Sequence, residues 1–252
     1  MSTSVFYDEL ACYYHLIYAD WQASIDRQAQ ALDSMIRSEA GPEAHTVLDG
    51  SCGIGTQSLG LAALGYEVQA SDLSPAAVER ARVEARQRNL PLQVSVADMR
   101  NVYEHHGRTF DVVLSCDNSV PHLLSNEDIL TAFRQFYQCT RPGGICLVSV
   151  KDYAAMDFSS RTQLHPYGVR DVGEVRYVLF QVWDLKLPLY DMTFYVIEHR
   201  GSYPATVHTA RATYYAVPIR VLIQLMEEAE FQDVHRIEGV FFQPIIAGRK
   251  RI

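Results

Sequence analysis

The sequence contains no apolar run long enough to cross a membrane, although 48% of its 252 residues are hydrophobic. A membrane-spanning helix needs about 20 consecutive apolar residues, so we expect a soluble, globular chain with no membrane partner. The first ten residues also lack the basic and then apolar pattern of a secretory signal. A cytoplasmic location is therefore predicted.

Cysteines and basic residues are too few and too scattered for two common kinds of site. The five cysteines form no CxxC pair, so neither a metal site nor a redox centre is predicted. The formal net charge is -8, which disfavours the basic surface that nucleic-acid binding needs. The densest basic stretch, residues 80–88, is interleaved with Glu84 and apolar positions and is interpreted as a solvated helix face. No nucleic-acid partner is expected.

Between residues 45 and 151 the sequence alternates short apolar runs with longer segments of helical periodicity. Strands joined by helical crossovers give this pattern, which predicts an α/β fold around a parallel sheet. A chain of this length can bury one substantial core, so a single domain is expected. The predicted strands are 46–49, 67–72, 92–97, 110–115 and 144–151, and the predicted helices are 24–38, 55–63, 75–88 and 126–139.

The pattern changes after residue 151, where two segments alternate apolar and polar residues on either side of Pro188. Residues 175–185 and 192–199 therefore predict an antiparallel sheet inserted after the fifth strand. A helix over 218–229 and strands over 234–237 and 240–247 follow. The single domain, 1–252, is thus divided into an amino-terminal segment (1–40), a core (45–151), an inserted cap (152–217) and a carboxyl-terminal part (218–252).

The first predicted strand ends in Asp49 and runs into a loop of small residues, Gly50-Ser51-Cys52-Gly53-Ile54-Gly55. Small side chains let a ligand approach the backbone, which favours a cofactor site, although an ordinary strand-to-helix turn has the same composition. A dinucleotide site requires G-x-G-x-x-G, and Ser58 stands where the third glycine would be. A nicotinamide-dependent oxidoreductase is therefore disfavoured.

Two carboxylates follow at the spacing that a nucleoside requires. Asp72 ends the second strand about 20 residues after the loop, where a carboxylate can accept hydrogen bonds from both ribose hydroxyls. Asp98 follows the third strand and can accept from an adenine amino group, while Met99 can pack on the ring. Alone, Asp72 is as typical of a helix cap, and Asp98 of a surface turn. Together with the loop they predict an adenosyl pocket at the carboxyl edge of the sheet.

These motifs resemble those of the class I, Rossmann-like S-adenosylmethionine-dependent methyltransferases. The resemblance spans roughly residues 45 to 150 and rests on LDGSCGIG at 48–55, Asp72, ADM at 97–99, FDVV at 110–113 and RPGG at 141–144. It implies a seven-stranded, mostly parallel sheet with helices on both faces, whose last strand, here 240–247, runs antiparallel.

The resemblance also implies S-adenosylmethionine as the cofactor. It places Asp49 near the methionyl amine, Asp72 on the ribose and Asp98 on the adenine. The other residues that it implies for the cofactor site are Gly50, Ser51, Gly53, Gly55, Leu73 and Met99.

The amino-terminal segment is rich in aromatic residues, because Tyr7, Tyr13, Tyr14, Tyr18 and Trp21 precede a helix that carries Arg27. An aromatic lid can contact a sulfonium by cation-π attraction and exclude water, and an arginine can pair with the methionyl carboxylate. The alternative is a helix packed in the core with Arg27 on its wet face. We favour the lid because five aromatics exceed what one packed face needs.

This segment, together with CDNSVPHL at 116–123, is similar to the glycine/sarcosine N-methyltransferase group. The similarity implies that Asn118 and His122 face the methyl acceptor and are the catalytic candidates. Where the group has an arginine for the substrate carboxylate, this chain offers Lys151, which supplies the charge without the bidentate fork. Carried over by position, the cofactor contacts are Tyr7, Tyr14, Trp21, Arg27 and Cys116, and the cap tyrosines that would close the pocket are Tyr195, Tyr214 or Tyr215.

The predicted activity is methyl transfer to a small-molecule acceptor by in-line displacement, with N-methylation of an amine or amino acid favoured. Small-molecule O-methylation and non-catalytic binding of S-adenosylmethionine are the alternatives, and Asn118, His122 and Tyr195 weigh against the second. An amine must lose a proton, for which His122 or a tyrosine is available. The oligomeric state is left open, a homo-oligomer included.

Overall fold

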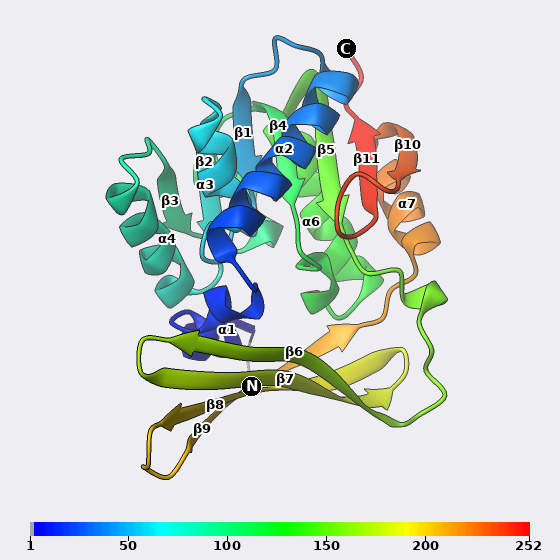
Figure 1. Cartoon of the computed structure of the whole chain (residues 1–252). Coiled ribbons are helices and arrows are strands. Elements are labelled where there is room, and N and C mark those ends of the chain that lie inside the picture. Colours follow the sequence, from blue (N-terminus) through cyan, green and yellow to red (C-terminus); the bar gives the residue numbers. More distant parts are fainter. Residues whose placement is uncertain (1–2) are drawn as a thin grey trace.

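Residues 3–252 are described by the structure, which is a computed structural model. Residues 1 and 2 of the predicted amino-terminal segment lie outside the described residues. A seven-stranded sheet, sheet A, forms the centre of the molecule in the spatial order β10-β11-β5-β4-β1-β2-β3 (Figure 1). Its strands are β1 (Thr46–Asp49), β2 (Glu67–Asp72), β3 (Gln93–Val96), β4 (Phe110–Ser115), β5 (Thr140–Ser149), β10 (Gln232–Ile237) and β11 (Ile245–Arg249).

Strands β1 to β5 pair in parallel, and β11 runs antiparallel to both of its neighbours, β5 and β10. The predicted seven-stranded, mostly parallel sheet is therefore confirmed. Every residue of β4 is buried, as expected for a strand that is covered on both faces.

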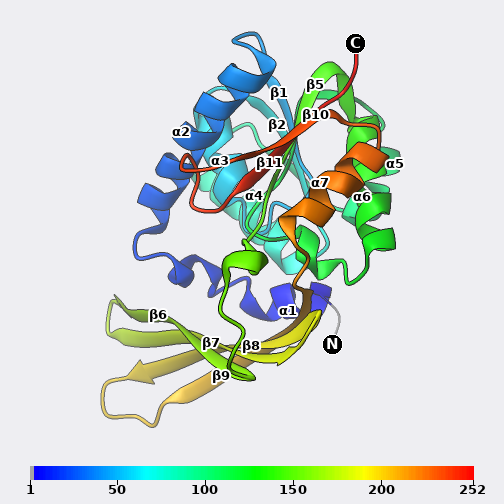
Figure 2. The same cartoon turned by 90° about the vertical axis from the view of Figure 1, so that its right-hand side faces the viewer.

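Helices cover the two faces of sheet A (Figure 2). On one face lie α2 (Trp21–Ala40), α3 (Thr56–Ala63) and α4 (Pro75–Gln87), which share a cluster of Ile25, Leu59 and Ala85. On the other lie α5 (Val102–His106), α6 (Asn126–Cys139) and α7 (Ile219–Glu228). Helices α4 and α6 begin where predicted because Ser74 and Ser125 accept hydrogen bonds from the backbone N–H groups of their first turns.

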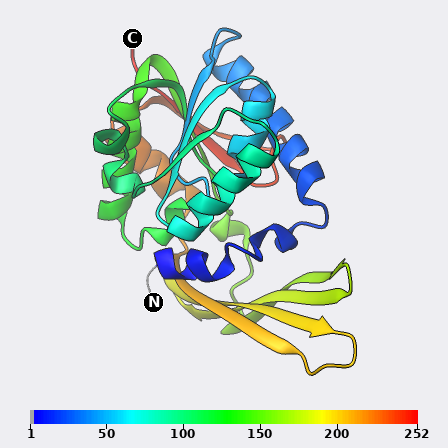
Figure 3. The same cartoon turned by 90° about the vertical axis from the view of Figure 1, so that its left-hand side faces the viewer.

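A second sheet, sheet B, lies below the carboxyl edge of sheet A, with the amino-terminal segment between the two (Figures 1 and 3). Its antiparallel strands β7 and β8 correspond to the two predicted cap segments, so the inserted antiparallel sheet is confirmed. Sheet B consists of β6 (Thr162–Val172), β7 (Val175–Lys186), β8 (Leu189–Arg200) and β9 (Thr206–Tyr215), and the segment above it contains α1 (Thr3–Leu10) and the one-turn helix η1 (Tyr14–Ile17).

The last strand begins later than predicted. Residues 240–247 were expected to form it, but β11 starts at Ile245, directly after Pro244, whose missing N–H ends the ladder there. The remaining short helices are η2 (Met99–Asn101), η3 (Val120–His122) and η4 (Tyr153–Ala155). Among residues 3–252, no helix combines the length and the apolar character that crossing a membrane requires.

Candidate active site

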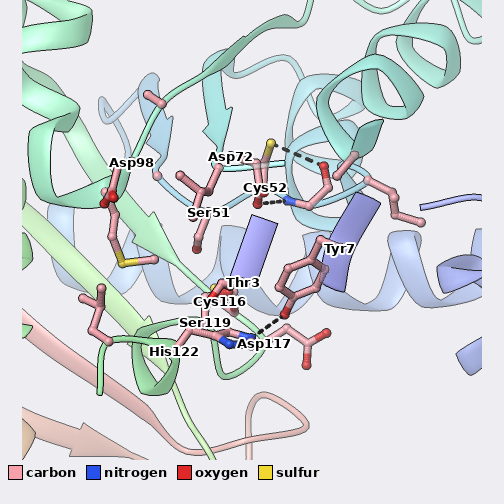
Figure 4. A pocket seen from close by; sticks show the side chains of 18 of the residues that line it. Thr3, Tyr7, Ser51, Cys52, Asp72, Asp98, Cys116, Asp117, Ser119 and His122 are labelled. Atoms are coloured by element: carbon pink, nitrogen blue, oxygen red, sulfur yellow. Dashed lines mark hydrogen bonds between the residues drawn. The ribbon is translucent and has the colours of Figure 1, made fainter. Parts of the chain in front are cut away.

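A pocket of about 290 Å³ opens at the carboxyl ends of β1, β2 and β4, under α1. Three parts of the chain form its wall: the amino-terminal segment, the loop after β1 with the acidic ends of its neighbours, and the turn after β4 (Figure 4). Eleven of the residues predicted for the cofactor and acceptor lie in this wall: Tyr7, Tyr14, Gly50, Ser51, Gly53, Asp72, Leu73, Asp98, Met99, Cys116 and His122.

The loop after β1 is held close to the sheet. The Gly50 N–H donates to the Leu114 carbonyl, and a side chain at Gly50 would lie 3.0 Å from the Phe136 ring. Gly53 has a φ of +52° and Gly55 one of +93°, conformations that other residues adopt only with strain. Gly53 and Gly55 are thus required by backbone geometry, and no atom lies within 4 Å of the place where a side chain at Gly53 would begin.

Asp49 lies beneath the loop and outside the pocket wall. Its carboxylate accepts a 2.6 Å hydrogen bond from the Ser58 hydroxyl and a 3.3 Å bond from the Ser51 N–H. Burial raises its pKa to about 6. Ser58, which stands where a dinucleotide fold has its third glycine, therefore holds the acid under the loop.

Asp72 is placed to bind a diol. Its two oxygens accept from the backbone N–H groups of Gly53 (2.8 Å) and Ser74 (2.9 Å), and each oxygen keeps a further lone pair toward the pocket. The same carboxylate thus shapes the glycine loop and faces the cavity (Figure 4). Burial raises its pKa, although these N–H groups oppose the shift.

Asp98 is fixed by an arginine that sequence reasoning did not consider. Burial raises the pKa of Asp98, but the Arg100 guanidinium, 2.7 Å from Oδ2, outweighs this and leaves the pKa lowered. Arg100 also contacts Asp128 on α6 at 3.1 Å. Asp98 is therefore ionised and held in one orientation at the far end of the pocket, next to Met99.

At the other end, His122 lies among aromatic rings. Its Nε2 is 2.8 Å from the Tyr7 hydroxyl, and its ring centroid is 4.0 Å from that of Tyr214 on β9. Its Nδ1 is buried and has no hydrogen-bond partner among the described residues. Burial lowers the pKa of His122 to about 3, with a contribution from Lys151, so the imidazole is neutral.

Asp117 also lies in the wall, and sequence reasoning missed it. Its Oδ2 accepts from the hydroxyls of Tyr14 (3.2 Å) and Tyr18 (3.5 Å), and its Oδ1 from the Gln243 amide (3.4 Å). Burial raises its pKa to about 6. Its one signal in the sequence is its position beside Cys116 in the quoted motif.

Asn118 and Lys151 support the turn from behind the wall. The Asn118 amide donates to the Tyr153 hydroxyl (2.8 Å), and its carbonyl accepts from the Lys151 backbone N–H (3.0 Å). The Lys151 ammonium lies over the Trp183 ring, 4.5 Å from its centroid. The structure therefore does not bring the side chains predicted to bind the acceptor, Asn118 and Lys151, into the pocket wall.

Four further predicted residues also lie outside the wall. Arg27 is exposed on α2, where its guanidinium donates to Ser24 of the same helix. Trp21 donates to the Thr56 hydroxyl (2.9 Å) and packs beside Arg80 and Arg88.

Tyr195 stacks on Phe180 on the outer face of sheet B, since its neighbour Phe194 faces inward. The Tyr215 hydroxyl donates a hydrogen bond to Asn126 Oδ1. Tyr214 is the cap tyrosine whose ring contacts His122.

Comparison with known proteins agrees with this geometry. Residues 47–144 match a family model described as a methyltransferase domain. The solved structure of DesVI from Streptomyces venezuelae superposes with a TM-score of 0.83 at 18% identity, covering 95% of this chain and 98% of that one. Residues 47–144 therefore carry a methyltransferase domain, and the fold is that of solved S-adenosylmethionine-dependent methyltransferases.

Two further likenesses bear on this methyltransferase domain. The sugar N-methyltransferase KedS8 from Streptoalloteichus shares the fold, with a TM-score of 0.78 at 17% identity, 95% of this chain and 93% of that one. A glycine/sarcosine N-methyltransferase from Parasynechococcus marenigrum is 31% identical over 134 residues. That match covers 53% of this chain and 46% of the relative, so the chain spans about half the length of such curated relatives.

The donor set of the methyltransferase domain fits an adenosyl cofactor. Asp72 keeps free lone pairs beside the glycine loop. Asp98 and Met99 line the pocket just after the end of the neighbouring strand, β3. The backbone at Gly53 is uncovered, with no atom within 4 Å of where its side chain would begin. The wall also contains the neutral side chains of Thr56, Gln57 and Tyr18, whereas Arg27 lies outside it.

Proposed function

We propose that this chain transfers the methyl group of S-adenosylmethionine to a nitrogen of a small-molecule amine that carries no carboxylate, such as an amino sugar. The observation that carries this proposal is the charge of the pocket wall. Among the described residues, the wall contains Asp72, Asp98, Asp117 and Asp128 and a single cation, Arg100, which is held by Asp98 and Asp128. Such a site attracts cations and repels carboxylates.

The names of two relatives suggest two acceptors, and the geometry separates them. A glycine-like acceptor needs a cation for its carboxylate, and Lys151 faces Trp183 behind the wall. An amino sugar needs none, and it presents hydroxyls that neutral groups can bind. The wall supplies such groups in Tyr7, Tyr14 and Ser119. The acceptor named for KedS8 therefore fits better than the one named for the glycine/sarcosine relative.

When bound, S-adenosylmethionine supplies an electrophilic methyl group on a positively charged sulfur, so the protein mainly aligns and desolvates the acceptor. Asp72 and Asp98 would fix the adenosyl end. Helix α1 and the tyrosines at 7, 14 and 18 would exclude water. We assign the acceptor side to His122, which lines the pocket, and the positioning of the turn to Asn118.

Calorimetry and product analysis test this proposal. Purified protein is titrated with S-adenosylmethionine and then assayed by mass spectrometry with D-glucosamine, glycine and D-glucose. We expect saturable cofactor binding, methylation of D-glucosamine, and little turnover of glycine or of D-glucose, the matched sugar without an amine. Methylation of D-glucose would show O-methylation instead. Cofactor binding without any turnover would favour a non-catalytic binding protein.

A further inference from the structure

Asp117 is a buried acid with no counter-ion in contact. Its oxygens meet only neutral donors, the hydroxyls of Tyr14 and Tyr18 and the amide of Gln243, and it forms no salt bridge with any residue of the described range 3–252. Removing a carboxylate from water without a cation costs several kcal/mol. The side chain nevertheless faces the cavity (Figure 4). A carboxylate in this arrangement is suited to bind a cationic ligand.

The backbone that presents Asp117 is strained and firmly held. Asp117 and Asn118 have φ values of 57° and 63°, which residues other than glycine adopt at a cost of about 1 kcal/mol or more each. The Asp117 N–H donates to the Ser149 hydroxyl (2.7 Å) and the Asn118 N–H to the Ser149 carbonyl (3.1 Å). Strain that the surroundings maintain in this way is typical of a functional turn.

We propose that Asp117 binds the ammonium group of the methyl acceptor and takes its proton before methyl transfer. This inference rests on the proposed function and names the residue that prepares the acceptor. A proton passes from the ammonium nitrogen to a carboxylate oxygen of Asp117, leaving a neutral amine and a carboxylic acid. The nitrogen lone pair then forms the new C–N bond as the C–S bond breaks and its electron pair returns to sulfur. The product leaves as an ammonium, and Asp117 returns its proton to water.

His122 is less suited to this step. Its Nε2 is engaged with Tyr7, and burial lowers its pKa to about 3, so an imidazole at this place does not retain a proton from an ammonium. Burial raises the pKa of Asp117 to about 6, which makes it a better proton acceptor and still leaves it mostly ionised near pH 7.

The groups that face Asp117 do not change charge around pH 6. Tyr7 on α1, Tyr14 and Tyr18 in the following segment and Tyr167 on β6 have pKa values raised by burial, and so does the neighbouring Cys116 thiol. Lys151, after β5, is the one cation that acts on it, and burial lowers its pKa to about 8. Burial also raises the pKa of Asp49, beneath the glycine loop, to about 6, so a titration near pH 6 is assigned to Asp117 by its absence from the Asp117→Asn variant.

The first test is turnover of D-glucosamine by Asp117→Asn as a function of pH, with the exposed hairpin variant Asp171→Asn as the matched control. We expect kcat/KM of Asp117→Asn to fall about 100-fold near pH 7 and to recover to within about 10-fold once the acceptor amine is unprotonated. Asp171→Asn should keep the wild-type profile. An equal loss at every pH, or no loss, would overturn the proposal.

A second test needs no acceptor. Sinefungin is a cofactor analogue in which a carbon bearing an ammonium group replaces the sulfur and its methyl group, and S-adenosylhomocysteine has an uncharged thioether at this position. We expect Asp117→Asn to bind S-adenosylhomocysteine like the wild type, which shows that it is folded, and to lose about 10-fold in its preference for sinefungin. An unchanged preference contradicts ammonium binding by Asp117. Failure of wild-type turnover would instead contradict the proposed function, so the two failures are distinguishable.

Discussion

The Lys151 ammonium acts on the pocket through its charge and not by contact. It lies over Trp183, while its positive charge favours the ionised form of Asp117 and so opposes the effect of burial on that pKa. The two side chains are more than a salt-bridge distance apart, since no ion pair joins them within residues 3–252. A carboxylate acceptor would require Lys151 to turn away from Trp183.

Lys151→Met distinguishes these two roles. Without the cation the pKa of Asp117, about 6 in the wild type, rises further, because the ionised form loses its support. Activity that needs ionised Asp117 appears as pH rises through this pKa, so we expect its onset to move up by about one pH unit. The measurement is kcat/KM of D-glucosamine against pH, with the exposed Lys186→Met as control. If the pH at which activity appears stays the same and only the KM for glycine rises, Lys151 binds a carboxylate.

Single residues of the site were predictable where the backbone dictates their type. The apolar pattern predicts the strands that precede the glycine loop, Asp72 and Asp98. Because parallel strands end at the same edge of a sheet, these residues meet in one pocket. Arg27 was assigned from its place after the aromatic segment and Tyr195 by resemblance, but rotation along a helix or alternation along a strand turns each away. Asp117 has no signal in the sequence beyond its place beside Cys116, because its role depends on tyrosines about 100 residues earlier in the chain.

Helix α1 is the element that covers the pocket, and one acid attaches it to the core. Asp8 Oδ1 accepts from the Ser74 hydroxyl (2.6 Å) and the Ala76 N–H (3.1 Å) at the start of α4. A carboxylate is favoured there because the first N–H groups of a helix lack internal partners and carry partial positive charge. Tyr7, the residue before Asp8 on α1, lies in the pocket wall.

Asp8→Ala tests whether this attachment orders the lid. We expect the free energy of unfolding to fall by about 1 kcal/mol, the usual effect of losing a helix cap. We also expect the Kd for S-adenosylmethionine to rise several-fold, since Tyr7 is no longer held in the wall. Denaturant titration and calorimetry measure the two effects. Glu9→Ala, one residue further on the exposed side of the same helix, should change neither, and equal Kd values for the two variants would contradict the role of Asp8.

Elements with a strong apolar pattern were predicted almost to the residue, and those without one were missed. β1, β2 and β4 begin and end as expected because each is a short run of largely buried residues. β6 contains Pro166 and Gly168 and is buried at no position, and β9 follows an exposed turn, so neither stands out in the sequence. Their pairing with β7 and β8 makes them strands.

At the scale of the molecule, the cofactor pocket brings together three parts of the chain that lie far apart in the sequence: the amino-terminal segment, the core loop at 50–57 and the turn at 116–123. At about 100 times its Kd, S-adenosylmethionine should therefore stabilise the fold by about 2.7 kcal/mol. Amide hydrogen exchange should slow in these three segments and stay unchanged in the exposed hairpin at 171–175. Asp72→Ala, which loses the predicted ribose contact, should show neither effect at the same concentration. Uniform protection of the whole chain, or none in α1, would contradict closure of the amino-terminal segment over the cofactor.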